Sequence, residues 1–106
     1  MTDEPDPEDA LARWRDEIDT IDAQMIRLLA ERFKITTKVG YWKAANDVPP
    51  VDPGRERRQV ERLEALAEET GLSHEFLTRF LRIIIDEVVR HHWIVRGEEF
   101  DAPDPL

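Results

Sequence analysis

A heptad pattern of apolar residues runs along the first half of the chain and constrains its fold more than any other feature. Spacings of three and four alternate, as in a helix that buries one narrow face against another helix. The positions are Leu11, Trp14, Ile18, Ile21, Met25, Leu28, Arg32, Ile35, Val39 and Trp42. Arg32 is the one charged member. Because a guanidinium is costly to desolvate, we expect it to meet an anion there, either a carboxylate of the protein or one of a ligand.

The helix that carries this pattern is predicted to be long. Residues 8–46 contain no proline and only one glycine, Gly40, which predicts a single helix of about 55 Å at 1.5 Å per residue. Two consecutive prolines, Pro49 and Pro50, end it, because proline lacks the backbone donor and restricts the residue before it. The rest of the chain is too short to cover such a helix. We therefore expect two copies to pack their long helices together in a homodimer.

Two shorter helices are predicted after the prolines. Asp52 has the character of an N-cap, with Pro53 at the first helical position, and Gly71 closes this second helix after about residue 69. Ser73 caps a third helix that extends to about residue 95. Its predicted buried face consists of Phe76, Leu77, Phe80, Leu81, Ile84 and Val88. The fold class is all-α, with three helices per chain in one domain over residues 8–96, and we expect the acidic, proline-containing residues 1–7 and 97–106 to be disordered.

The amino-acid composition argues against several classes of function. The chain has 106 residues, 37% of them charged, and a formal net charge of −9, which disfavours binding to nucleic acid or to an anionic membrane. It has no apolar stretch near the roughly 20 residues that cross a bilayer and no secretory signal, so we expect a cytoplasmic protein. Cysteine is absent, which excludes disulfides and thiolate metal sites. We expect no metal at His91 and His92, because adjacent helical side chains point about 100° apart.

Cationic side chains on the long helix suggest a site for a small dianion. Arg32 and Lys43 are eleven residues apart, which places them on one face with roughly 16 Å between their Cα atoms. A guanidinium fork could hold one end of a dianion and an ammonium could polarise the other. Arg15 lies roughly 25 Å from Arg32 along the helix, so only an antiparallel partner helix would bring it to the same site. Alternatively, Arg15 and Lys43 are ordinary surface residues, and Arg55 with Glu56 is a solvated pair.

From Leu11 to His92 the chain resembles the chorismate mutases of the all-helical class. The motifs that carry the resemblance are RDEIDTID at residues 15–22, LLAER at residues 28–32, Val39-Gly40 with Lys43, Pro50-Val51-Asp52 with Arg55-Glu56, and IIIDE at residues 83–87. The resemblance implies an intertwined dimer of three-helix chains. It also implies the rearrangement of chorismate to prephenate in aromatic amino-acid biosynthesis, with no metal, cofactor or covalent intermediate.

The same resemblance implies a role for each site residue. Arg32 and the partner subunit's Arg15 would bind the two carboxylates of the substrate, aided by Arg55. Lys43 would donate to the ether oxygen, where negative charge develops in the transition state. Asp52 and Glu56 would hold the ring hydroxyl, Asp52 at least partly through its backbone. Clamping both carboxylates would also select the compact conformer that reacts.

Two positions depart from the usual pattern of that class. His92 stands where many members have a glutamine that donates to the ether oxygen, and Val88 stands where several have a small hydroxyl residue. A neutral imidazole donates one hydrogen bond and an imidazolium a stronger one, so His92 predicts a pH dependence on the acid side. The alternative is that His92, or its neighbour His91, only caps the end of the third helix.

Other functions remain open at this point. An isochorismate pyruvate lyase and a 4-amino-4-deoxychorismate mutase would use the same cationic clamp, and the surroundings of Asp52 and Glu56 would distinguish them. A third alternative is a non-catalytic helical dimer that binds a metabolite or a partner enzyme of the same pathway. The presence of Arg15, Arg32 and Lys43 together with Glu56 argues against it.

Overall fold

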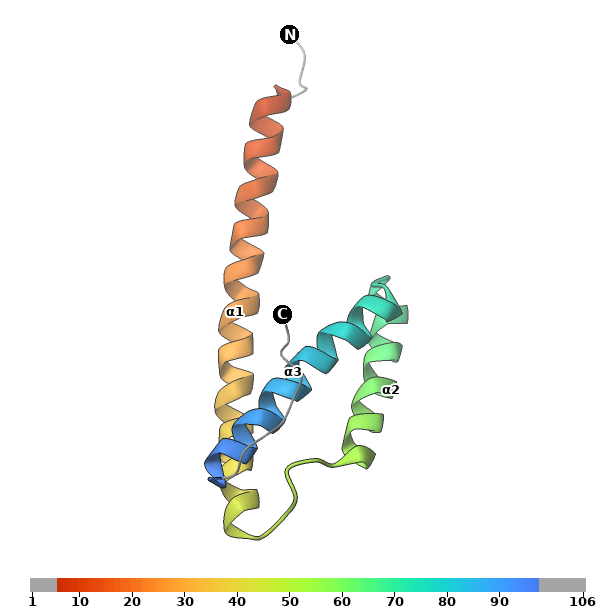
Figure 1. Ribbon diagram of the computed structural model, residues 1–106. Coiled ribbons are helices and arrows are strands. Elements are labelled where there is room, and N and C mark those ends of the chain that lie inside the picture. Colours follow the sequence, from red (N-terminus) through yellow and green to blue (C-terminus); the bar gives the residue numbers. More distant parts are fainter. Residues whose placement is uncertain (1–5, 98–106) are drawn as a thin grey trace. The chain divides into compact units, whose positions relative to one another are not determined.

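The computed structural model describes residues 6–97, which form helices and turns with no strand. The helices are α1 (Pro7–Ala45), α2 (Pro53–Thr70) and α3 (His74–Val95) (Figure 1). All three predicted helices are confirmed. Helix α1 begins at Pro7, inside the segment predicted to be disordered, because proline is well suited to a first helical turn. Asp6 and Gly97, also in the segments predicted to be disordered, make backbone hydrogen bonds to Ala10 and Ile94, and the rest of that prediction falls on residues 1–5 and 98–106, outside the described residues.

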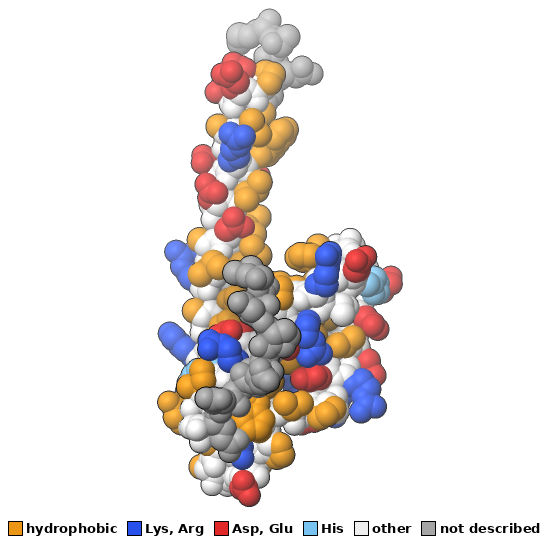
Figure 2. All heavy atoms as spheres, viewed as in Figure 1, with side chains coloured by type: hydrophobic (Ala, Val, Ile, Leu, Met, Phe, Trp, Pro, Cys, Tyr) orange, Lys and Arg blue, Asp and Glu red, His pale blue; other side chains and the backbone are white. Residues whose placement is uncertain are grey.

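The first of two compact parts is the N-terminal stretch of α1, up to Lys34. Its first turn carries Glu8 and Asp9, which complement the partial positive charge of a helix N-terminus. The apolar face of this stretch is open to solvent in the single chain: Trp14 is 58% exposed and Leu28 is 63% exposed. Figure 2 shows hydrophobic side chains along one side of this stretch of the helix. A continuous exposed apolar face of this kind is typical of interaction surfaces.

The second part begins at Ile35 and contains the end of α1 together with α2 and α3. Helices α2 and α3 form a hairpin (Figure 1). Its core is a ladder of buried α3 residues four apart, which packs against half-buried residues of α2 and the end of α3. The ladder is Leu81, Ile85 and Val89, and the residues packed on it are Val60, Leu63 and Trp93. Burying each large aliphatic side chain of this ladder stabilises the hairpin by about 1.5–3 kcal/mol.

The predicted buried face of α3 was wrong at Phe76 and Phe80 and was confirmed at Leu81 and Ile84. Phe76 and Phe80 are exposed, and their rings stack on each other with centroids 6.1 Å apart. The two residues are one helical turn apart on the same ridge, so each covers part of the other rather than the core. The core lies further along α3, at the ladder that begins with Leu81.

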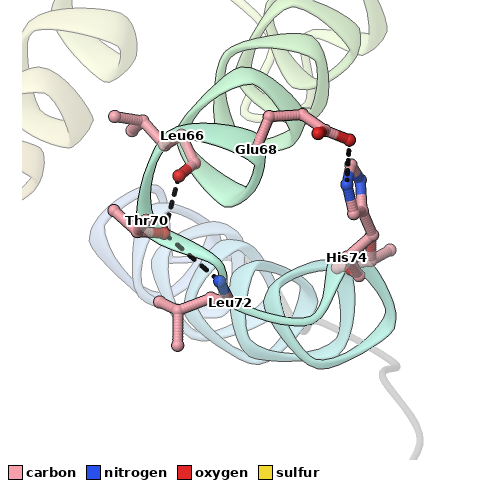
Figure 3. Close-up of polar contacts among 6 residues, drawn as sticks. Leu66, Glu68, Thr70, Leu72 and His74 are labelled. Atoms are coloured by element: carbon pink, nitrogen blue, oxygen red, sulfur yellow. Dashed lines mark hydrogen bonds and ion pairs between the residues drawn. The ribbon is translucent and has the colours of Figure 1, made fainter.

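The turn between α2 and α3 is closed by local hydrogen bonds. Gly71 adopts the left-handed conformation (φ 78°) that favours glycine, and its N–H donates to the Ala67 carbonyl. The Thr70 hydroxyl bonds backbone groups on both sides of the turn, and Glu68 Oε1 lies 2.8 Å from His74 Nε2 (Figure 3). The caps predicted at Asp52 and Ser73 are confirmed. Over residues 6–97, no helix has both the length and the apolar character needed to cross a bilayer.

Candidate active site

The eight predicted site residues are divided between the two parts of the chain. Arg15 and Arg32 belong to the first part, where Arg15 is exposed and Arg32 is half-buried. Their separation of seventeen residues on one helix corresponds to about 25 Å. One copy of α1 therefore cannot bring both guanidinium groups to one small molecule. The other six residues lie in the second part, and they are Lys43, Asp52, Arg55, Glu56, Val88 and His92.

Lys43 is held at the end of α1 by the loop that follows it. Its Nζ atom donates to the carbonyl of the buried Pro50 at 3.2 Å. The backbone N–H of Val48 donates to the Lys43 carbonyl at 2.9 Å. An ammonium has three donors, so the bond to Pro50 fixes the charge and leaves two N–H groups for a ligand.

Arg96, at the end of α3, holds the same loop. One guanidinium nitrogen donates to the Val48 carbonyl at 2.5 Å, and another lies 3.5 Å from Oδ1 of Asp47. The Arg96 side chain is only 17% exposed. Sequence reasoning missed this contact, although a cation just after the last helical turn is a visible signal. The loop carbonyl that it meets belongs to a segment 48 residues away, and only the folded chain brings the two together.

His92 is buried, and its ring connects α3 to α1. The residue is 3% exposed, and Nε2 lies 2.9 Å from the Thr36 carbonyl oxygen. A carbonyl only accepts, so Nε2 carries the proton and Nδ1 of the neutral ring is a bare lone pair. Among residues 6–97, Nδ1 has no hydrogen-bond partner. The ring therefore does not cap its own helix, and it could donate from Nδ1 only as an imidazolium.

The surroundings of His92 favour the neutral ring. Burial lowers the pKa of His92 below its ordinary value, and the nearby charges of Lys43 and His91 lower it further. The hydrogen bond to Thr36 opposes this by raising the pKa. Near neutral pH the ring is thus a donor to Thr36 and an acceptor at Nδ1. His91, its half-buried neighbour, points elsewhere on the helix.

Gly40 makes room for the His92 ring. A Cβ atom at position 40 would lie 2.6 Å from Cδ2 of His92, far inside van der Waals contact. Gly40 was visible in the sequence as the one glycine of the long helix, but the residue that uses the space could not be identified there. Val88, which is half-buried, lies one turn before His92 on α3 and so shares its face.

Asp52 and Glu56, the two predicted site carboxylates, lie at the start of α2. Asp52 Oδ1 accepts a hydrogen bond from the backbone N–H of Arg55 at 3.0 Å, so this carboxylate is engaged as a helix cap. The Arg55 side chain is exposed. Glu56 is half-buried, and its Oε2 lies 3.5 Å from a guanidinium nitrogen of Arg82 on α3. Sequence reasoning missed Arg82, because the hairpin has to form before residues 26 positions apart can meet.

The second part thus presents two groups of chemically useful side chains. Lys43 and His92 lie near the end of α1, and Asp52, Arg55 and Glu56 lie at the start of α2. In the first group Lys43 supplies N–H donors and neutral His92 supplies an acceptor at Nδ1, and the second group supplies carboxylates with a nearby guanidinium. Within residues 6–97, no three His, Cys, Asp or Glu side chains gather as ligands for a metal ion.

Comparison with known proteins identifies a family whose sequence pattern spans these residues. The sequence pattern of the family described as Chorismate mutase type II matches residues 14–93. The bifunctional chorismate mutase/prephenate dehydratases of Buchnera aphidicola and Escherichia coli K12 are each 34% identical to the chain, over 80 and 82 residues. These matches cover 76% and 77% of the chain but only 21% of each relative. The 4-amino-4-deoxychorismate mutase of Streptomyces venezuelae is 28% identical over 89 residues, which are 84% of the chain and 86% of that relative.

Proposed function

The chain belongs to the type II chorismate mutase family, and we propose that it catalyses the rearrangement of chorismate to prephenate. The observation that carries the proposal is the family match over residues 14–93, which contains all eight predicted site residues. We further propose that the reaction serves phenylalanine and tyrosine biosynthesis. The fusion of a mutase with prephenate dehydratase in the bifunctional relatives supports a partner enzyme from the same pathway.

Substrate binding begins with the two carboxylates. We propose that Arg32 and Arg55 bind them together with the partner subunit's Arg15. The exposed apolar face of α1 supports a homodimer, since a second α1 would bury Trp14, Leu28 and the residues between them. Fixing both carboxylates stabilises the compact, chair-like conformer, in which the bond-forming carbons approach each other.

Lys43 is the proposed donor to the ether oxygen. As the C–O bond breaks, negative charge accumulates on that oxygen, so a fixed donor binds the transition state more strongly than the substrate. The bond from Nζ to the Pro50 carbonyl supports this role, because it positions the ammonium before the substrate arrives. His92 would supply a second donor from Nδ1 only when its ring is protonated, since Nε2 is engaged by Thr36. Val88 would provide an apolar contact to the substrate.

The ring hydroxyl is proposed to bind at the start of α2. Because the Asp52 side chain caps the helix, its contribution would come largely from the backbone. Glu56 is then the carboxylate that accepts a hydrogen bond from the ring hydroxyl.

A second candidate is the rearrangement of the 4-amino analogue of chorismate. The match to the Streptomyces venezuelae mutase favours it, because that match spans most of both chains. The two substrates differ at the ring substituent that we place near Glu56. Assays with each substrate separately distinguish the two functions.

The proposal is tested by giving the purified chain chorismate, isochorismate and 4-amino-4-deoxychorismate in separate reactions. Because rearrangement leaves the mass unchanged, the products are separated by chromatography and assigned by NMR. We expect prephenate from chorismate. Substituting Lys43→Ala should lower kcat by about 10²–10³-fold, whereas Lys38→Ala, an exposed lysine of the same helix, should leave kcat unchanged. Release of pyruvate from isochorismate alone, or no product from any substrate, would overturn the proposal.

A further inference from the structure

Arg82 occupies a bridging position between two carboxylates. Its guanidinium nitrogens lie 3.5 Å from Oε2 of Glu56 on α2 and 3.4 Å from Oδ1 of Asp86, one turn further along α3. The Glu56 side chain is 22% exposed, whereas those of Arg82 and Asp86 are each 54% exposed. The cation pairs with Oε2 of Glu56, and the other oxygen of that carboxylate can accept a hydrogen bond from another donor.

The charge beside Glu56 determines which ring substituent fits there. A hydroxyl needs only an acceptor oxygen, and a carboxylate that is paired through one oxygen can still accept from it at the other. An amine that is protonated at neutral pH carries a full positive charge, so its binding depends on the net charge around it. Two like charges a few ångströms apart repel each other, and the repulsion is weaker where solvent screens them. A guanidinium next to Glu56 therefore penalises a cationic substituent and not a neutral one.

We propose that Arg82 is a specificity-determining residue that, by pairing with Glu56, makes the site select a hydroxyl over an amine on the substrate ring. The inference rests on the proposed function, because it assumes that the ring substituent binds at Glu56. Arg82 itself is a positioning residue, since it acts through Glu56 and has no assigned contact with substrate. Asp86, which pairs with the other terminal nitrogen of Arg82, partly offsets the Arg82 charge.

The test compares kcat/KM for chorismate with kcat/KM for 4-amino-4-deoxychorismate. Both substrates have the same two carboxylates, so their ratio cancels general losses of folding or carboxylate binding. We expect wild type to prefer chorismate. In Arg82→Gln the ratio should shift toward the amine by roughly three- to ten-fold. Arg82→Lys, which keeps the charge, should stay within about twofold of wild type, and Asp86→Asn should shift the ratio further toward the hydroxyl.

Arg90→Gln is the matched control, because Arg90 is an exposed arginine of α3 that pairs with Glu87 rather than Glu56. Its ratio should equal that of wild type. An unchanged ratio in Arg82→Gln, an equal shift in Arg90→Gln, or a wild-type preference for the amine would each overturn the inference. Wild type that converts neither substrate would instead refute the proposed function, so the two failures are distinguishable.

Discussion

The imidazole Nε2 of His92 and the carbonyl oxygen of Thr36 are 2.9 Å apart, which joins the end of α3 to α1. The same ring occupies the space that Gly40 leaves by having no side chain. The His92 ring is therefore both a donor and a packing element. Several measurable properties of the protein depend on this one contact.

Stability should fall on the acid side because of His92. Its pKa is lowered in the folded chain, first by burial and then by Lys43 and His91. Below about pH 6.5, His92 therefore binds a proton more readily in the unfolded chain than in the folded chain. The free energy of unfolding decreases as pH falls. Urea unfolding at pH 7.5 and pH 5.5 should show a larger decrease for wild type than for His92→Gln. Equal decreases would mean that His92 titrates as it does in the unfolded chain.

Gly40→Ala should destabilise the protein because of the clash with His92. In the wild-type background we expect a loss of about 1–3 kcal/mol from overpacking. In a His92→Ala background the clash is gone, and alanine should stabilise the helix by up to about 1 kcal/mol relative to glycine. Denaturant unfolding of all four chains at one protein concentration gives the coupling energy. If Gly40→Ala has the same effect in both backgrounds, the two residues do not share this space.

The pH dependence of the rate tests whether His92 assists the reaction. If the imidazolium donates from Nδ1, kcat should fall as pH rises through the lowered pKa of His92. The pH–rate profile of His92→Gln should not show this fall. A neutral glutamine amide can donate at any pH. Steady-state kinetics between about pH 5 and pH 8, with circular dichroism to confirm folding, would show the difference. If kcat of the wild type does not fall with rising pH, Lys43 is left as the proposed side-chain donor to the ether oxygen.

The sequence predicted the helices well because their signals are local. The heptad spacing, the prolines after α1 and the caps at Asp52 and Ser73 each act within a few residues, and the structure confirms these elements. The contacts of Arg82 and Arg96 could not be predicted, because each joins residues far apart in the sequence. The predicted burial of Phe80 failed for a related reason, since the 3.6-residue period does not specify which side of a wide apolar face meets α2.

Arg96→Met should weaken the loop that holds Lys43. The substitution keeps an apolar stem but leaves the Val48 carbonyl without its charged donor, at a cost of about 1–3 kcal/mol in stability. Because the loop carries the Pro50 carbonyl, we also expect kcat to fall more than KM rises. Arg79→Met, an exposed arginine near the other end of α3, is the control and should change neither. An unchanged kcat in folded Arg96→Met would separate the loop from catalysis.

Complementation tests whether Arg15 acts across a dimer. Arg15→Ala and Arg32→Ala should each be nearly inactive, because each removes a carboxylate-binding group from both sites. In a mixed dimer one site has both arginines and the other has neither. Refolding an equal mixture should therefore restore about a quarter of the wild-type activity. No recovery, with subunit exchange demonstrated by mass spectrometry after one of the two variants has been labelled with 15N, would place Arg15 outside the partner's site.

The fit between Gly40 and the His92 ring also limits the order in which this protein can change over evolutionary time. While histidine occupies position 92, any side chain at position 40 meets its ring, so glycine is retained. A lineage that first replaces the histidine with a smaller residue gains the freedom to place alanine at position 40, which favours the helix. That alanine then blocks the return of histidine. The order of substitution at the two positions is thus constrained, and in the present pair, Gly40 with His92, neither substitution has been made.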